Sequence, residues 1–140
     1  MSTTNTPGTP IPDGELSAFM RAAGLHLTDV GPQTVTGWID LGPEHHQPWG
    51  LVHGGVYTSA IETAASVGAS TAAAEHGLVA VGVNNNTNFV RSMVTGRVDV
   101  LATAIQQGRT AQLWEVRVTD SEDRLVAIGQ VRLQNVTPRS

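Results

Sequence analysis

Two residues in the middle of the chain could act together on a carbonyl group. Gly54 lies in the run QPWGLVHGG, residues 47–55, which leads into an alanine-rich helical segment. Backbone N–H groups at a helix start lack intrahelical partners, and a glycine lets a ligand oxygen approach them closely. Such an N–H would polarise a carbonyl and stabilise its developing oxyanion. Glu62, the only acidic residue between Glu44 and Glu75, could act as nucleophile or general base.

The spacing of these two residues predicts a dimer. Glu62 follows Gly54 by eight residues, which is about 12 Å along a helix axis, so the two cannot easily meet within one chain. Two antiparallel helices around a two-fold axis would bring Glu62 of one subunit to Gly54 of the other. Ser66 is one turn further on and could orient the carboxylate. Two alternatives stay open: a glycine pair that only starts a helix, and a glutamate that only faces solvent.

Three histidines within nine positions, His45, His46 and His53, could ligate zinc. However, His45 and His46 are adjacent, no HExxH motif is present, and the only nearby acid is Glu44. We therefore predict no metal site.

Polar residues also occupy a predicted strand and two strand ends. Asn84, Asn86 and Asn88 share one face of that strand, whereas Asn85, Thr87 and Phe89 share the other. Such a row could line a pocket, contact another subunit or face solvent. The pairs Arg91-Ser92 and Arg109-Thr110 place cations and hydroxyl groups at strand ends, which suits phosphate groups.

The elements that position these residues predict an α+β fold. In order, the pattern indicates a short helix capped by Asp13 and closed by Gly24, strands 25–30 and 34–40, a loop, a long helix 56–76 ended by Gly77, and strands 79–90, 96–106, 112–118 and 125–134. Four late strands in succession predict an antiparallel meander, whose apolar face the long helix must cover. We expect a long central helix wrapped by a curved antiparallel sheet of about six strands.

Composition narrows the class of protein. The chain has 140 residues, a net charge of -4 and no cysteine, which fits one domain, residues 13–140, with a single core. Residues 1–12 are rich in Thr, Pro and Gly and predict a disordered tail rather than a secretion signal. There is no basic block, so nucleic-acid binding is not expected. The low-charge stretch 54–74 carries Glu62, which argues against a membrane span. We expect a cytoplasmic protein.

These motifs resemble a known family. His53-Gly54-Gly55, the helix acid Glu62, the run NTNFVR at 86–91, Gly96 and Gly108-Arg109 are similar to the hotdog-fold acyl-CoA thioesterases of the PaaI / 4-hydroxybenzoyl-CoA thioesterase group. The resemblance covers roughly residues 38–133. It implies a long helix wrapped by a curved sheet, with active sites at a homodimer interface and the dimers usually paired into tetramers. No cofactor is implied, since coenzyme A is part of the substrate.

The resemblance also implies roles for single residues. The Gly54 N–H would polarise the thioester carbonyl, His53 would shape the loop, and Gln47 would orient water or the carbonyl. Glu62 matches the catalytic carboxylate, and Ser66 matches a residue that positions water. Together these residues favour the Arthrobacter-type arrangement.

The implied function is hydrolysis of an acyl-CoA. Trp49 and Tyr57 flank the glycine pair and favour an aromatic or medium-chain acyl group. Ser92 departs from the proline that many relatives carry there. Two other functions stay open: a non-catalytic acyl-CoA or lipid-binding hotdog protein, and a hotdog dehydratase or hydratase. The residues expected to contact the substrate or its coenzyme A are Trp49, Tyr57, Asn86, Arg91, Ser92, Arg109 and Thr110.

Overall fold

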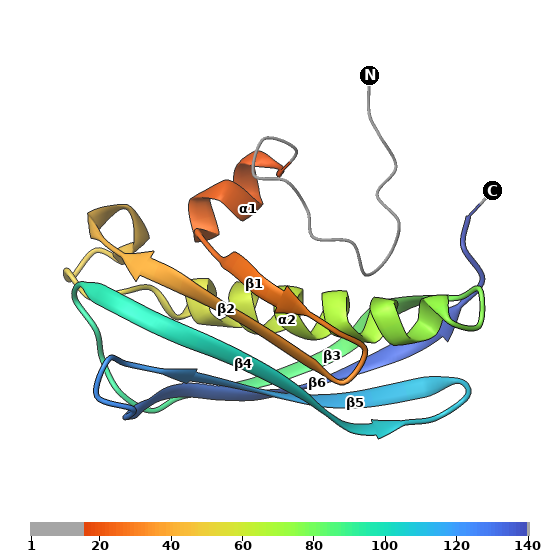
Figure 1. Ribbon diagram of the computed structural model, residues 1–140. Coiled ribbons are helices and arrows are strands. Elements are labelled where there is room, and N and C mark those ends of the chain that lie inside the picture. The colour runs from red at the N-terminus through yellow and green to blue at the C-terminus, as the bar shows by residue number, and fades with distance from the viewer. Residues whose placement is uncertain (1–15, 140) are drawn as a thin grey trace.

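The computed structural model describes residues 16–139, which form a six-stranded antiparallel sheet with one long helix lying along it (Figure 1). The expected tail, residues 1–12, lies outside the described residues. The elements are α1 (Ala18–Ala23), β1 (His26–Val30), β2 (Thr34–Leu41), the 3₁₀ helix η2 (Pro43–His45), α2 (Gly54–Ala74), β3 (Val79–Phe89), β4 (Gly96–Gln107), β5 (Ala111–Thr119) and β6 (Leu125–Val136). The predicted α+β fold with a wrapped central helix is confirmed.

The first helix begins later than the sequence pattern suggested. Ser17 is the N-cap of α1, because its Oγ accepts the N–H of Met20 at 3.2 Å. The expected cap, Asp13, lies outside the described residues. Gly24 ends the helix as predicted, with a left-handed φ of 80°.

The long helix α2, predicted over residues 56–76, spans Gly54–Ala74, and its ends carry the expected signals. The Nδ1 atom of His53 caps its start, and Gly77 follows its end with a φ of 71°. The N–H of Leu78 bonds the carbonyl of Ala73 at 3.0 Å, which is the closure expected after a C-terminal glycine. Small residues let the sheet approach closely: a Cβ at Gly68 would overlap the Trp114 ring of β5. The alanine-rich composition therefore reflects tight packing between α2 and the sheet.

The strand order corrects one sequence prediction. The order is β1-β2-β4-β5-β6-β3, so the predicted meander holds only for the last three strands, and β3 pairs with β6 instead of β4. Residues 90–95 connect β3 to β4, and a connection of this length is not the two-residue turn of a tight hairpin. β4 instead pairs with β2 from Gly96 opposite Leu41 to Thr103 opposite Thr34. As a result, β3 is an edge strand of this sheet.

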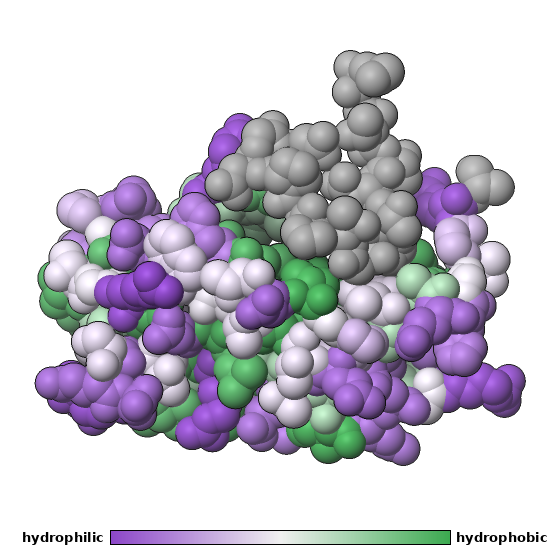
Figure 2. Space-filling view, in the orientation of Figure 1, coloured by the Kyte–Doolittle hydropathy of each residue, from purple (hydrophilic) through white to green (hydrophobic). Residues whose placement is uncertain are grey.

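The core fills the space between α2 and the inner face of the sheet. Trp114, Ile61 and Leu133 are among its largest fully buried side chains. On the outside, hydrophobic side chains gather toward the middle of the face shown in Figure 2, and hydrophilic ones toward its two ends. Within residues 16–139, no helix is long and apolar enough to cross a membrane.

Candidate active site

A tight loop before α2 holds the side chain of Gln47. The Gln47 N–H bonds the Leu51 carbonyl at 2.7 Å, and Gly50 makes the turn with a φ of 84°. The Gln47 side-chain oxygen accepts the N–H of Trp49 at 2.6 Å and that of Leu51 at 3.4 Å. The loop occupies the oxygen of this amide, and among residues 16–139 no hydrogen-bond partner is found for its NH₂ group.

The start of α2 leaves one backbone donor open. The His53 Nδ1 atom accepts the Gly55 N–H at 2.8 Å, and the His53 carbonyl accepts the Val56 N–H at 3.0 Å. Among residues 16–139, no hydrogen-bond partner is found for the Gly54 N–H. The Phe89 ring packs directly on Gly54, where an added Cβ would lie 2.5 Å from it. An unpaired N–H at a helix start is a site for a carbonyl oxygen or an anion.

These groups line one cavity of roughly 200 Å³. Tyr57 lies at its wall, only 3% exposed, and within residues 16–139 its hydroxyl has no hydrogen-bond partner. Burial raises the pKa of Tyr57 to about 12, so the hydroxyl stays protonated. The structure thus brings five of the predicted residues to one cavity: Gln47, Gly54, Tyr57, Arg91 and Ser92.

Glu62 lies outside this cavity on the same helix. It is half-buried, and its position eight residues after Gly54 places it about 12 Å further along α2. Ser66 Oγ donates to Glu62 Oε2 at 3.4 Å, which confirms the expected contact between successive turns. Within one chain, the Glu62 carboxylate is therefore separated from the groups that line the cavity.

Asn85, which no sequence motif singles out, is the second partner of the Glu62 carboxylate. Its Nδ2 donates to Glu62 Oε1 at 3.1 Å. The predicted residue Asn86 is exposed, and the alternation along β3 puts it on the opposite face, away from Glu62. The signal that could have identified Asn85 was its shared face with Thr87 and Phe89, since asparagine is unusual on a strand.

Three other predicted residues are not brought to the cavity of the same chain. The Trp49 side chain is 83% exposed and does not line the cavity. Arg109 and Thr110 lie in the turn after β4, whereas Ser92 precedes β4. The length of β4 therefore separates Arg109 and Thr110 from the cavity near Ser92 by roughly 36 Å, at about 3.3 Å per residue.

The three histidines bind backbone groups. His45 Nδ1 accepts the Gly42 N–H at 3.1 Å, and His46 Nε2 contacts the Val94 carbonyl at 2.6 Å. His53 caps α2. In the part of the chain that the structure describes, no cluster of three or more His, Cys, Asp or Glu side chains is placed to hold a metal ion. These contacts give the histidines a role in shaping the loop before α2.

Comparisons with known proteins identify the family and support the fold. A family model described as "Thioesterase superfamily" matches residues 50–127. A "Putative esterase" of Mycobacterium tuberculosis is 44% identical over 136 residues, covering 96% of this chain and 97% of that protein. Its solved structure has a TM-score of 0.84 at 45% identity, covering 89% of this chain and all of the other.

Two further similarities involve proteins with enzymatic names. A 1,4-dihydroxy-2-naphthoyl-CoA hydrolase of Listeria monocytogenes is 32% identical over 112 residues, covering 80% of this chain and 90% of that protein. A solved thioesterase of Haemophilus influenzae has a TM-score of 0.78 at 27% identity, covering 85% of this chain and 82% of the other. The chain therefore belongs to the thioesterase superfamily of hotdog-fold thioester hydrolases.

Proposed function

We propose that the chain hydrolyses aromatic or medium-chain acyl-CoA thioesters at two equivalent sites shared across a homodimer interface. One observation carries the proposal: a carbonyl-binding half around Gly54 and a carboxylate half around Glu62 lie on one helix but too far apart to act together. The 32% identical relative, named for an aromatic acyl-CoA, supports the choice of acyl group.

In the first half-site, two donors would hold the thioester carbonyl. Gly54 and Gln47 both line the cavity, and neither the Gly54 N–H nor the Gln47 NH₂ group is used within the loop. Both would bond the carbonyl oxygen more strongly as negative charge develops on it. The positive end of α2 adds to this stabilisation. Arg91, at the exposed edge of the cavity, is suited to the phosphate groups of coenzyme A.

In the second half-site, the Glu62 carboxylate of the partner subunit would act on the carbonyl carbon. By one route it attacks directly, forms a mixed anhydride and releases coenzyme A as the thiolate, after which water hydrolyses the anhydride. By the other route it takes a proton from an attacking water, and the collapsing tetrahedral intermediate expels the thiolate. Ser66 would orient that water. Both routes give the carboxylic acid and free coenzyme A.

The edge strand β3 supports the two-fold pairing. Val81 and Val83 on β3 are 48% and 56% exposed, and a strand edge with apolar side chains favours pairing with another strand. Pairing with the β3 strand of a second copy would continue the sheet and lay the two α2 helices antiparallel. Gly54 of one copy would then face Glu62 of the other. The family resemblance further implies that two such dimers form a tetramer. The molar mass measured by light scattering tests this.

The activity is tested by measuring free coenzyme A released from a panel of benzoyl-, hydroxybenzoyl-, octanoyl- and palmitoyl-CoA. We expect turnover of at least one of the first three, and a loss of at least 100-fold in kcat for Glu62→Ala. If the wild type releases coenzyme A from none of them, or the variant is equally active, the assignment is wrong. Tight binding without turnover would instead favour an acyl-CoA-binding protein.

Sharing of the site between subunits is tested by complementation. Gly54→Ala would place a Cβ against Phe89 and impair the first half-site, and Glu62→Ala removes the second. A heterodimer of the two variants carries one site with both halves intact. Random co-assembly should therefore restore about a quarter of the wild-type activity. If co-expression restores nothing beyond the sum of the two variants, each site belongs to a single chain.

A further inference from the structure

The Glu62 carboxylate is held by a short chain of hydrogen bonds from β3. Thr87 Oγ1 donates to Asn85 Oδ1 at 2.7 Å, which leaves the Asn85 NH₂ group turned toward α2. That group donates to Glu62 Oε1 at 3.1 Å and to the carbonyl of Thr58 at 3.2 Å. Asn85 thus ties the carboxylate both to β3 and to the preceding turn of its own helix.

An irregularity in β3 aims Asn85 at Glu62. Gly82 also faces the carboxylate, because a Cβ there would overlap Glu62 Oε2. Residues an odd number apart on a regular strand point to opposite faces, so Gly82 and Asn85 could not both face α2. The register against β6 shifts between Gly82 and Asn84, which inserts one residue and reverses the alternation. Such bulges re-aim side chains and are common beside active sites.

The two carboxylate oxygens consequently have different surroundings. Oε1 accepts an N–H of the Asn85 amide. Within residues 16–139, Oε2 has only the longer contact to Ser66 at 3.4 Å, and it lies beside Gly82. Gly82 is an exposed position on the edge strand and has no side chain to cover Oε2. Oε2 is therefore the more weakly bonded oxygen, and it lies against the edge strand where the second subunit would bind.

We propose that Asn85 is the positioning residue for Glu62: it fixes Oε1 and so presents Oε2 to the reacting group. This inference rests on the proposed thioesterase function, and it goes beyond it by assigning separate roles to the two oxygens. A reacting group displaced by about 1 Å can lower a rate on the order of 100-fold. We therefore expect Asn85→Leu to lower kcat roughly 10- to 100-fold while KM changes less than about threefold.

The experiment compares kcat and KM of the full-length wild type, Asn85→Leu and Asn85→Asp on the best acyl-CoA of the panel. Asn85→Asp keeps the shape of the side chain but replaces the donor with an acceptor, so it should lose at least as much kcat even if the leucine variant folds poorly. Asn88→Leu is the matched control, because Asn88 is an exposed asparagine on the other face of β3. It should keep kcat within about twofold, as expected of a surface change.

A double-mutant cycle distinguishes positioning from a general structural effect. If Asn85 acts only through Glu62, adding Asn85→Leu to Glu62→Gln should cause no further loss of kcat, because the group that it positions is already gone. Additive losses, a change confined to KM, or an Asn85→Asp variant with wild-type kcat would overturn the inference and leave the proposed function standing. A wild type that hydrolyses no acyl-CoA would overturn both.

Discussion

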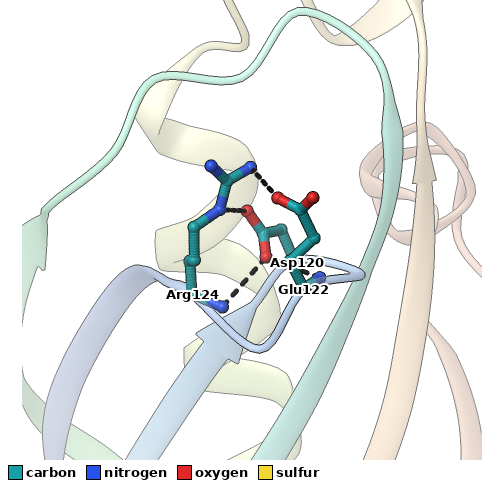
Figure 3. A network of polar contacts seen from close by, with 3 residues as sticks. All are labelled: Asp120, Glu122 and Arg124. Carbon is teal, nitrogen blue, oxygen red and sulfur yellow. Dashed lines mark hydrogen bonds and ion pairs between the residues drawn. The ribbon is translucent and has the colours of Figure 1, made fainter.

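Two carboxylates of this chain are held in different ways. Asp120, in the turn between β5 and β6, is only 3% exposed and accepts three short hydrogen bonds. These come from the N–H groups of Glu122 and Arg124 at 2.9 Å each and from Arg124 Nε at 2.8 Å (Figure 3). Glu62 accepts two longer contacts, at 3.1 and 3.4 Å. Asp120 therefore accepts more and shorter hydrogen bonds than Glu62 does.

The donors around Asp120 also set its protonation. Burial raises the pKa of Asp120, but the Arg124 and Glu122 N–H groups and the Arg124 guanidinium outweigh burial and hold that pKa below its ordinary value. A carboxylate bonded in this way stays charged and closes a turn. A carboxylate that must accept a proton or attack a carbonyl needs an oxygen without strong donors. By this criterion, Glu62 is suited to chemistry and Asp120 to structure.

The largest expected effect comes from neutralising each carboxylate in turn. Glu62→Gln should lower kcat on the best acyl-CoA by about 1,000-fold, because the amide can neither take a proton nor attack, while the fold persists. Asp120→Asn should keep kcat within about twofold and lower the midpoint of thermal unfolding by about 3–5 °C. Steady-state kinetics and thermal unfolding of both variants check this. If Asp120→Asn loses activity without losing stability, Asp120 does not have the purely structural role that distinguishes it from Glu62.

The arrangement of residues along α2 could be predicted from the sequence, because it depends on local spacing. The start of α2 at Gly54, its end before Gly77 and the contact between Glu62 and Ser66 all follow from helix geometry. The separation between Gly54 and Glu62 follows from the same rise per residue.

The rest depends on pairing between distant segments. Alternation was correctly predicted within residues 84–89, but which face meets α2 depends on the bulge after Gly82, and a one-residue shift reverses it. The run at 86–91 that resembles the family points to Asn86, whereas the residue that bonds Glu62 is Asn85. The position of Arg109 likewise depends on β4 running away from the cavity along β2, and no local pattern specifies the order of the strands.

A smaller effect is expected from Gly82→Ala, which tests whether the space beside Glu62 matters. The added Cβ would overlap Oε2 and force the carboxylate to move, so kcat should fall about 10- to 30-fold while KM stays within threefold. Gly31→Ala is a matched control in the turn between β1 and β2, where the nearest atom is a carbonyl at 3.3 Å. Equal kinetics for Gly82→Ala and wild type would show that Glu62 does not need this space.

The Tyr57 hydroxyl extends the comparison to stability. It is buried without a partner among residues 16–139, and such a group costs roughly 1–3 kcal/mol relative to a satisfied one. The ligand-free Tyr57→Phe variant should therefore be as stable as the wild type or have a free energy of unfolding about 1 kcal/mol higher. Asp120→Asn should instead lower the free energy of unfolding. Denaturant unfolding measures both, and a clear destabilisation by Tyr57→Phe would mean that a second subunit supplies a partner for the hydroxyl.

The smallest expected effect is the pH dependence of the Asp120 turn. Because folding lowers the pKa of Asp120, its charged form stabilises the folded state at pH values above the unfolded pKa of about 3.9. That contribution is lost as the pH falls below this value and through the folded pKa. The difference in unfolding midpoint between wild type and Asp120→Asn should thus be constant from pH 7 to about 5 and shrink toward pH 2.5. If the difference in unfolding midpoint stays constant to pH 2.5, the turn depends on the shape of the Asp120 side chain and not on its charge. The charge of Asp120 would then no longer distinguish it from Glu62.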